Sequence, residues 1–173
     1  MNEDYATLKA PSEEEAGFAA TLAQSGEKLW FPVNPTETSA HIGGIVATNA
    51  SGARSYRYGP TRQWVRGINV VLADGRLLTL RRGEVRAESG VFEFEERDGT
   101  IRTLCFENLK WPATKATLGF PLVEDMDLID LFIGSEGSLG VIVEVELALA
   151  KRPLSTIGVL ALAANERMAL QLV

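Results

Sequence analysis

Ile42-Gly43-Gly44-Ile45-Val46-Ala47-Thr48-Asn49-Ala50-Ser51-Gly52 is the stretch that decides how this chain folds, and Pro32-Val33-Asn34-Pro35-Thr36 precedes it closely. Its glycines, its other small residues and its lack of charge allow the backbone to lie against something large and flat. A second run, Gly134-Ser135-Glu136-Gly137-Ser138-Leu139-Gly140, leads into the apolar strand pattern Val141-Ile142-Val143. Glycine accepts positive φ and lacks the Cβ that would hold a ligand away. The two stretches therefore predict two walls of one binding site, which indicates a cofactor.

Four motifs, in this order, resemble the FAD-binding domain of the p-cresol methylhydroxylase / vanillyl-alcohol oxidase superfamily. They are Pro32 to Thr36, Ile42 to Gly52, Arg57-Tyr58-Gly59, and Leu131 to Ile142. Within the superfamily they look most like the FAD-linked 2-hydroxyacid oxidoreductases of the bacterial glycolate oxidase and D-lactate dehydrogenase type. Each motif alone is a weak signal, but all four in the family's order are a strong one.

The resemblance implies FAD as the cofactor, with its contacts at the matching motif positions. These positions are Pro35, Thr36, Ile42, Gly43, Gly44, Thr48, Asn49, Ala50, Gly52, Tyr58, Gly59, Glu136, Gly137, Gly140 and Ile142. Tyr58-Gly59 would fix the loop beside the isoalloxazine ring. Glu136 would either approach the ribose and adenine part of FAD or be a solvated loop carboxylate. The resemblance assigns no catalytic residue and no metal ligand to this chain.

Some parts of the family have no counterpart here. The family's FAD domain opens with a subdomain whose glycine-rich loop takes the pyrophosphate, whereas before Trp30 this sequence has only the isolated Gly17 and Gly26. The substrate-covering domain corresponds at most to a first strand and the start of a helix after Lys151. We therefore expect residues 1–150 to be the second subdomain of an FAD-binding domain, and residues 151–173 to be the start of a truncated substrate (cap) domain.

The function implied is that of a fragment or subunit of an FAD-dependent oxidoreductase, acting on a 2-hydroxy acid or a related CH–OH donor and contributing part of the FAD site. The chain alone is expected to be inactive. In the full enzyme the substrate would be a small-molecule hydroxyacid, and a partner subunit or a second copy could supply the missing wall. The alternative is a noncatalytic module that keeps the fold and uses its cleft as an interaction surface.

Composition agrees with a soluble cytoplasmic domain. Of the 173 residues, 46% are hydrophobic and 23% are charged, which are ordinary globular values. The net charge of −6 argues against nucleic acid as a partner, because phosphate binding needs a basic surface. No apolar run is long enough for a membrane span, and the charged N-terminus is no signal peptide. Cys105, the single cysteine, excludes an internal disulfide and is expected to be buried and inert on a strand.

The patterns predict an α+β fold, with an antiparallel or mixed sheet and helices covering one face. We expect the sheet to include residues 68–80, 91–106 and 140–149. Asp74-Gly75 and Asp98-Gly99 are the expected hairpin turns, and Ile68 to Ala73 reads as a buried central strand. Leu154 to Ala163 is a further strand candidate.

The expected helices have recognisable ends. One runs from the capping box at Ser12 to about Gln24, with Gly26 as its stop. A short second helix lies within Ala40 to Ala50, and Asn165 caps a third. From Glu107 to Asp130 no period is evident, which favours a functional loop.

Several charged groups allow two interpretations. Arg54, Arg57, Arg62 and Arg66 either face an anionic part of FAD or of a substrate, or form a solvated face or an interface. For the acidic group Glu124, Asp125, Asp127 and Asp130 a solvated loop is favoured over a metal site. His41, the one histidine, is expected to be neutral and bonded to a neighbouring backbone group rather than attached to FAD.

The sequence predicts that the 173-residue chain alone binds FAD weakly or not at all. Loss of two or three charge-assisted hydrogen bonds to the pyrophosphate, at about 1.5–3 kcal/mol each, weakens affinity by several powers of ten. Titration of the chain with free FAD should give millimolar or undetectable binding. Submicromolar binding by the monomer would refute this prediction, and tight binding confined to a dimer would show that a second copy supplies the missing wall.

Overall fold

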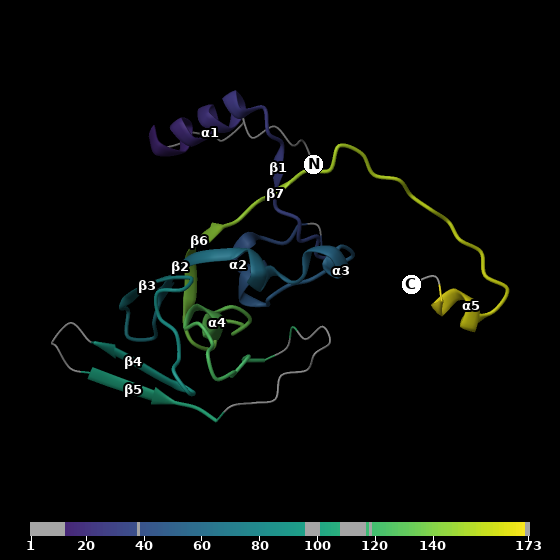
Figure 1. Cartoon of the computed structure of the whole chain (residues 1–173). Coiled ribbons are helices and arrows are strands. Elements are labelled where there is room, and N and C mark those ends of the chain that lie inside the picture. Colours follow the sequence, from purple (N-terminus) through teal and green to yellow (C-terminus); the bar gives the residue numbers. More distant parts are fainter. Residues whose placement is uncertain (1–12, 38, 96–100, 108–116, 118, 172–173) are drawn as a thin grey trace. The chain divides into compact units, whose positions relative to one another are not determined.

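The computed structural model describes residues 13–37, 39–95, 101–107, 117 and 119–171, and it confirms the predicted α+β class with short helices and small antiparallel sheets (Figure 1). The chain divides into two compact units. One is Trp30–Ala150, and the other combines Met1–Leu29 with Lys151–Val173. All of the predicted cofactor contacts belong to the Trp30–Ala150 unit. Among the described residues, no helix is both long and apolar enough to span a bilayer.

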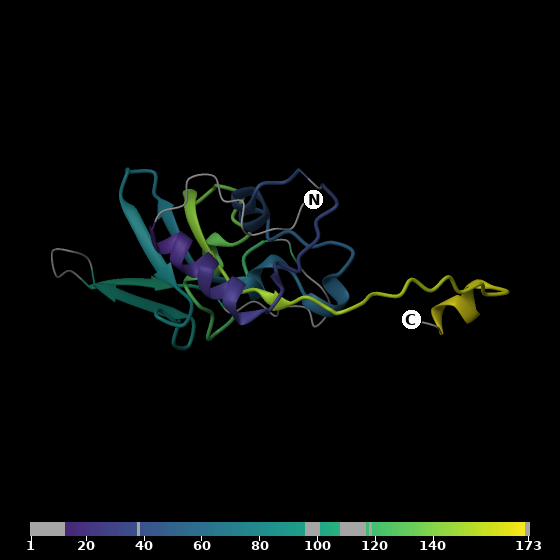
Figure 2. The same ribbon diagram turned by 90° about the horizontal axis from the view of Figure 1, so that it is seen from above.

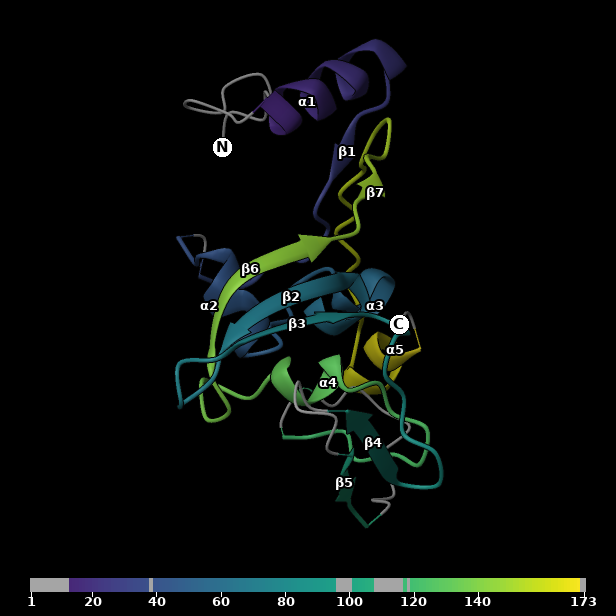
Figure 3. The same cartoon turned by 90° about the vertical axis from the view of Figure 1, so that its left-hand side faces the viewer.

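The central sheet contains the predicted hairpin. Strand β2 (Val65–Val71) pairs antiparallel with β3 (Leu77–Arg81) and, at its other edge, with β6 (Val141–Leu147). The three strands lie side by side with β2 in the middle (Figure 3), which confirms β2 as the central strand. Gly75 closes the turn with φ +82, and its N–H donates to Leu72 O.

Helix α2 (Ile42–Ala47) and helix α4 (Ile129–Phe132) cover one face of this sheet (Figure 1) and enclose the main core. Helix α2 confirms the short helix expected within Ala40 to Ala50. Helix α3 (Ser55–Tyr58) and the 3₁₀ helix η2 (Thr61–Trp64) connect α2 to β2. The buried core side chains are Val46, Val65, Ile68, Val70, Leu80, Ile129, Phe132 and Ile133.

The second hairpin does not extend the central sheet, which corrects our expectation of one sheet. Strands β4 (Val91–Glu95) and β5 (Ile101–Cys105) form a separate two-stranded sheet that runs across the direction of the central strands (Figure 2). After β3 the chain turns through Gly83, at φ +91, and the Ala87 N–H then donates to Met126 O. This contact places β4 beside the segment that precedes α4, away from the β3 edge. The predicted turn at Asp98-Gly99 lies outside the described residues.

The separate sheet has its own small core, in which the buried Phe92 packs with Ala87 and Met126. Cys105 at the end of β5 is exposed, so the expectation of a buried thiol was wrong. Every residue of β5 is exposed, because a two-stranded sheet has no further strand or helix to cover it.

The unit made of the chain ends contains helix α1 (Glu13–Ser25), which ends at Gly26 with φ +66, as predicted. The capping residue Ser12 lies outside the described residues. Strands β1 (Leu29–Trp30) and β7 (Ala150–Lys151) form a two-stranded sheet. Near the other end, Asn165 Oδ1 accepts from Met168 N at 3.0 Å and caps helix α5 (Glu166–Leu170), as predicted.

Leu154 to Ala163 forms no strand, which corrects another prediction. The segment is irregular and exposed, and Leu154, Ile157, Val159, Leu160 and Leu162 are each at least 85% exposed. A strand requires a neighbouring strand for its backbone hydrogen bonds. No described residue pairs with this segment in a ladder. The apolar pattern was therefore real, but strand pairing could not be inferred from it.

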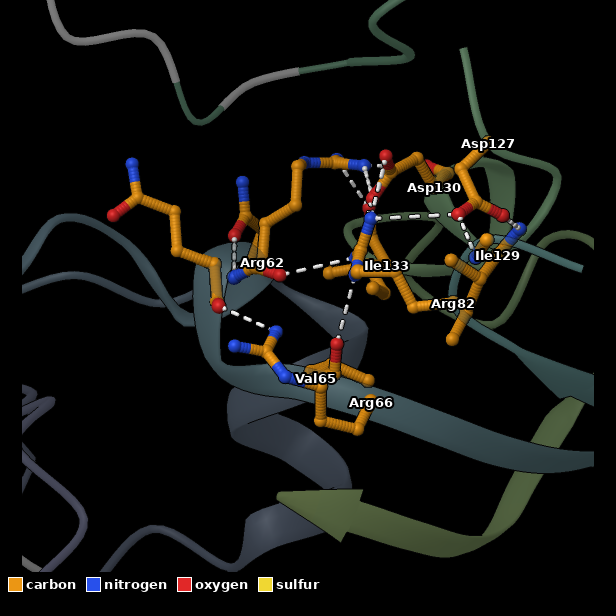
Figure 4. A network of polar contacts seen from close by, with 11 residues as sticks. Arg62, Val65, Arg66, Arg82, Asp127, Ile129, Asp130 and Ile133 are labelled. Atoms are coloured by element: carbon orange, nitrogen blue, oxygen red, sulfur yellow. Dashed lines mark hydrogen bonds and ion pairs between the residues drawn. The ribbon is translucent and has the colours of Figure 1, made fainter. Parts of the chain in front are cut away.

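Asp130 joins three distant segments through two arginines (Figure 4). Arg82 donates two hydrogen bonds, of 2.8 and 3.0 Å, to the Asp130 carboxylate, and Arg62 forms an ion pair with the same carboxylate at 3.1 Å. Arg82 also donates to the carbonyl oxygens of Val65 and Arg62. Nearby, the buried Asp127 accepts from Gly83 N. Asp127 and Asp130 therefore do not lie in a solvated loop, as we had expected; only Glu124 and Asp125 of that acidic group are exposed.

The two arginines respond differently to this environment. Burial lowers the pKa of Arg62, and its attraction to Asp130 opposes that effect only in part. Burial acts in the same direction on Arg82, but the hydrogen bonds and charge of Asp130, together with the charge of Asp127, outweigh it and raise the pKa of Arg82. Both guanidinium groups stay charged near neutral pH, since arginine titrates far above it.

Asp130→Asn should lower the free energy of unfolding by about 2–3 kcal/mol, because it leaves the half-buried Arg62 without a counter-charge and leaves Arg82 with only Asp127, 4.0 Å away. Urea denaturation followed by circular dichroism measures this change. The matched control is Glu146→Gln, which breaks the pair of Glu146 with Arg81 on the exposed face of the sheet, where both side chains are more than half exposed. The control should stay within about 0.5 kcal/mol of wild type. Equal effects of the two variants would contradict a structural role for Asp130.

Candidate functional site

The two glycine-rich stretches, far apart in the sequence, meet at the C-terminal end of α2. Gly134 N donates to Val46 O at 3.1 Å, and Glu136 N donates to Ala47 O at 2.9 Å. The last carbonyl groups of a helix have no partner within the helix, so these two donors satisfy them. We call Gly134–Gly140 the glycine loop. Its attachment to α2 explains why the two sequence motifs occur together.

Three glycines of these motifs are required by the fold. A Cβ on Gly52 would lie 1.6 Å from Asn34 O, and one on Gly140 would lie 2.6 Å from Val70 Cγ1. A Cβ on Gly134 would lie 3.1 Å from Asn49 Cβ, and Gly134 also has φ +90. Such close approaches exclude any side chain without rearrangement. Glycine at these positions is explained by packing alone.

Pro35 and Gly52 form an isolated antiparallel bridge, so the first two motifs are joined directly. Gly52 N also donates to Ser55 Oγ at 2.7 Å, at the start of α3. The neighbouring Thr36 is exposed. The Pro32–Thr36 segment is therefore held beside the end of the Ile42–Gly52 stretch, with Thr36 accessible to solvent.

Asn49 and Ala50 act as anchors for the chain that follows. Asn49 is 1% exposed, has φ +46, and accepts at Oδ1 from Arg62 N at 2.9 Å. Ala50 O accepts from both the N–H and the hydroxyl of the buried Thr61. Their side chains or carbonyls are thus used within the protein. Ile142 likewise packs against the main core.

An aromatic cluster surrounds the third motif. Trp64 Nε1 donates to Tyr58 O at 2.8 Å, and the Tyr58 ring stands edge-on to those of Trp30 and Trp64, with centroids 5.7 and 6.3 Å away. Next to Tyr58, Gly59 has φ +69, and a Cβ there would meet the Gln63 side chain. The loop after α3 is therefore fixed by packing and hydrogen bonds.

The four arginines of this region do not form one patch. The Arg54 guanidinium lies 4.4 Å from the centroid of the Trp30 ring, and that of Arg57 lies 5.4 Å from the centroid of the Tyr58 ring. Arg66 donates to Gln63 O, while Arg62 is turned into the Asp130 network. Arg62 is thus neither part of a solvated face nor exposed to an anionic ligand, whereas the other three remain accessible.

The open part of the site is the outer surface of α2. Added Cβ atoms on Gly43 and Gly44 would meet nothing within 4 Å, and the adjacent Ile42 is 41% exposed. Thr48 is exposed at the end of this helix and donates to Gly44 O at 2.9 Å. In the glycine loop Glu136 and Gly137 are exposed. These residues form a surface of bare backbone and small side chains with a single carboxylate.

His41 is the N-cap residue of α2, is exposed, and makes no capping hydrogen bond with its side chain. The bond to a neighbouring backbone group that we expected is therefore not seen at this helix end. Sequence reasoning also missed the part that Arg62 and Asp130 play in holding the site. No local signal pairs them, since the guanidinium of Arg62 bonds a carbonyl 68 positions away.

Comparison with known proteins finds related sequences. Residues 17–81 match the FAD binding domain family. A D-lactate dehydrogenase of Anaerostipes hadrus is 33% identical over 141 residues, which are 80% of this chain and 22% of that protein. A D-2-hydroxyglutarate dehydrogenase of Xanthomonas citri pv. viticola is 35% identical over 148 residues, which are 85% of this chain and 23% of that protein. The rat mitochondrial D-2-hydroxyglutarate dehydrogenase is 38% identical over 66% of this chain.

The chain spans about a quarter or less of the length of these curated relatives. The matched segment contains three of the four motifs, namely Pro32 to Thr36, Ile42 to Gly52 and Arg57 to Gly59. The family implies FAD as its cofactor. Residues 17–81 therefore form part of an FAD binding domain, and the chain is distantly homologous to the D-lactate and D-2-hydroxyglutarate dehydrogenases.

Proposed function

We propose that this chain forms one wall of the FAD site of an oxidoreductase that acts on a 2-hydroxy acid of the D-lactate or D-2-hydroxyglutarate kind. The observation that carries the proposal is the open space above Gly43 and Gly44 in α2. A helix containing two glycines is less stable by about 1 kcal/mol for each than the same helix with alanine. Nothing in the described packing requires glycine at these two positions, unlike Gly52 and Gly140.

A ligand that must approach the backbone closely would explain both glycines. The isoalloxazine and ribityl parts of FAD are flat or slender and would lie against such a surface. Ile42 offers an apolar contact at one end of α2, while Thr48 and the exposed residues Glu136 and Gly137 of the glycine loop offer polar contacts at the other. The residues present therefore fit this group. We propose Gly43, Gly44, Thr48, Glu136 and Gly137 as the contacts nearest to FAD.

When bound, FAD would supply the acceptor for the hydride that leaves the alcohol carbon of the substrate. This chain's residues would position that cofactor and exclude water from one side of it. We assign neither the binding of the hydroxyacid nor the removal of its proton to any residue of this chain. We also propose a reducing compartment such as the cytoplasm, because Cys105 is the only cysteine of the sequence.

Replacing both glycines together, Gly43→Ala and Gly44→Ala, should separate cofactor binding from folding. The double variant should be as stable as wild type or more stable, by about 0.5–2 kcal/mol in urea denaturation, because alanine favours the helix. Its binding of FAD should be weakened at least tenfold. The contrasting variant, Gly52→Ala, should lose about 1–3 kcal/mol or more through overpacking against Asn34. A double variant that is destabilised as much as Gly52→Ala would show that the fold requires these glycines after all.

Of the two outcomes that the sequence allows, millimolar or undetectable binding, the proposed site requires millimolar binding, and binding of that strength still allows the site to be mapped. We expect millimolar FAD, added to isotope-labelled chain, to shift the amide resonances of Gly43, Gly44, Thr48, Glu136 and Gly137 in two-dimensional NMR spectra. The amides of the opposite, polar face of the sheet, at Asn69, Thr79 and Glu144, are the internal control and should not move. Shifts confined to that control face, or none at all, would contradict the proposed site and favour a noncatalytic module.

A further inference from the structure

We propose that Arg62 is a positioning residue that holds the glycine loop against α2 in the arrangement the flavin wall needs. That Arg62 supports a flavin site rests on the proposed function. That Arg62 holds the glycine loop rests on the contacts of Arg62 alone. The Arg62 side chain is 16% exposed and reaches into the polar network around Asp130 (Figure 4). Arg62 is thus too buried to contact a ligand on the outer surface of α2 and acts through other residues.

Arg62 bonds both stretches that make up the wall. Its backbone N–H donates to the side chain of Asn49, directly after α2. Its guanidinium donates to Asp130 O at 2.6 Å and to Ile133 O, the last carbonyl before the glycine loop. A single residue therefore fixes the end of α2 and the beginning of the loop that bonds to that end.

The chemistry of the side chain explains why arginine suits this position. The carbonyl groups of Asp130 and Ile133 belong to α4 and to the residue that follows it. Such carbonyls lack helical partners and attract a cation. The planar guanidinium reaches both with separate N–H groups, while its charge is balanced by the Asp130 carboxylate. Lysine carries the charge but lacks the rigid fork.

Arg82 provides a matched comparison within the same network. It binds the same Asp130 carboxylate and donates to the carbonyl oxygens of Val65 and Arg62. It makes no hydrogen bond to the glycine loop or to Ile133 within the described part of the chain. Removing either charge should weaken the fold, but only removal of the Arg62 charge should release the loop selectively.

Amide hydrogen exchange of the 173-residue chain, followed by NMR, tests this directly without any cofactor. In Arg62→Gln, the amides of Gly134 and Glu136 should exchange at least tenfold faster than in wild type, since a charged hydrogen bond to Ile133 is lost. The amides of the central strand β2 should change by less than about threefold. Arg82→Gln should accelerate the loop and β2 amides by the same factor. Arg62→Lys keeps the charge and is the milder change, so exchange at Gly134 and Glu136 should again rise more than exchange in β2, but by a smaller factor. This variant replaces Arg62→Gln in the test if Arg62→Gln does not fold.

The inference is overturned if exchange at Gly134 and Glu136 is unchanged in both Arg62 variants, or rises only in step with β2. Millimolar FAD then tests the purpose of the positioning. We expect its shifts at Gly43 and Gly44 to be weaker in Arg62→Lys than in wild type, and equal shifts alongside a released loop would refute the link to the flavin wall. If wild type shows no FAD shifts, the proposed function fails, while the exchange rates still decide the role of Arg62.

Discussion

The half-buried carboxylate of Asp130, held between Arg82 and Arg62, is the interaction on which the rest of the Trp30–Ala150 unit depends. It connects the end of β3, the 3₁₀ helix before β2, and α4. Four- and six-residue helices are not stable alone, so α2 and α4 depend on these connections together with the packing of Val46, Ile129 and Phe132 in the main core. The same network leads to the glycine loop through Ile133, so the stability of the sheet and the shape of the site share one set of contacts.

The glycines of this domain fall into two groups with different physical reasons. Gly52, Gly134 and Gly140 are needed because another part of the chain occupies the space of their Cβ atoms. Gly43 and Gly44 lie in a helix with open space above them and lower its stability. The second group is where a molecule outside the chain gives the best explanation. A glycine-rich motif thus contains both folding and binding information, and the structure separates the two.

A surface of exposed backbone and small side chains is suited to form one part of a cofactor site rather than the whole site. The exposed surface of α2 and the glycine loop offers contact area and few charges, and its one carboxylate, on Glu136, would repel a phosphate. Of the accessible arginines, Arg54 and Arg57 lie over aromatic rings. Firm binding of a dianionic pyrophosphate needs converging donors or basic groups from elsewhere. This agrees with the comparisons, in which the matched segments cover only 22% and 15% of two relatives.

The sequence alone determined the helix and strand positions of α1, α2, β2, β3 and β6, the capping of α5 by Asn165, and the family. These features depend on local patterns, such as alternation, turn residues, and glycines in a fixed order, which are contained within short segments. Only the tertiary structure decided that β4 and β5 form their own sheet, that Cys105 is exposed, and that Leu154 to Ala163 is not a strand. Only the structure, too, showed that Asp127 is buried, that Asp130 is half-buried, and that both pair with arginines. The pairings of Asp130 join residues 48 and 68 positions apart, and a single sequence has no local signal for such pairings.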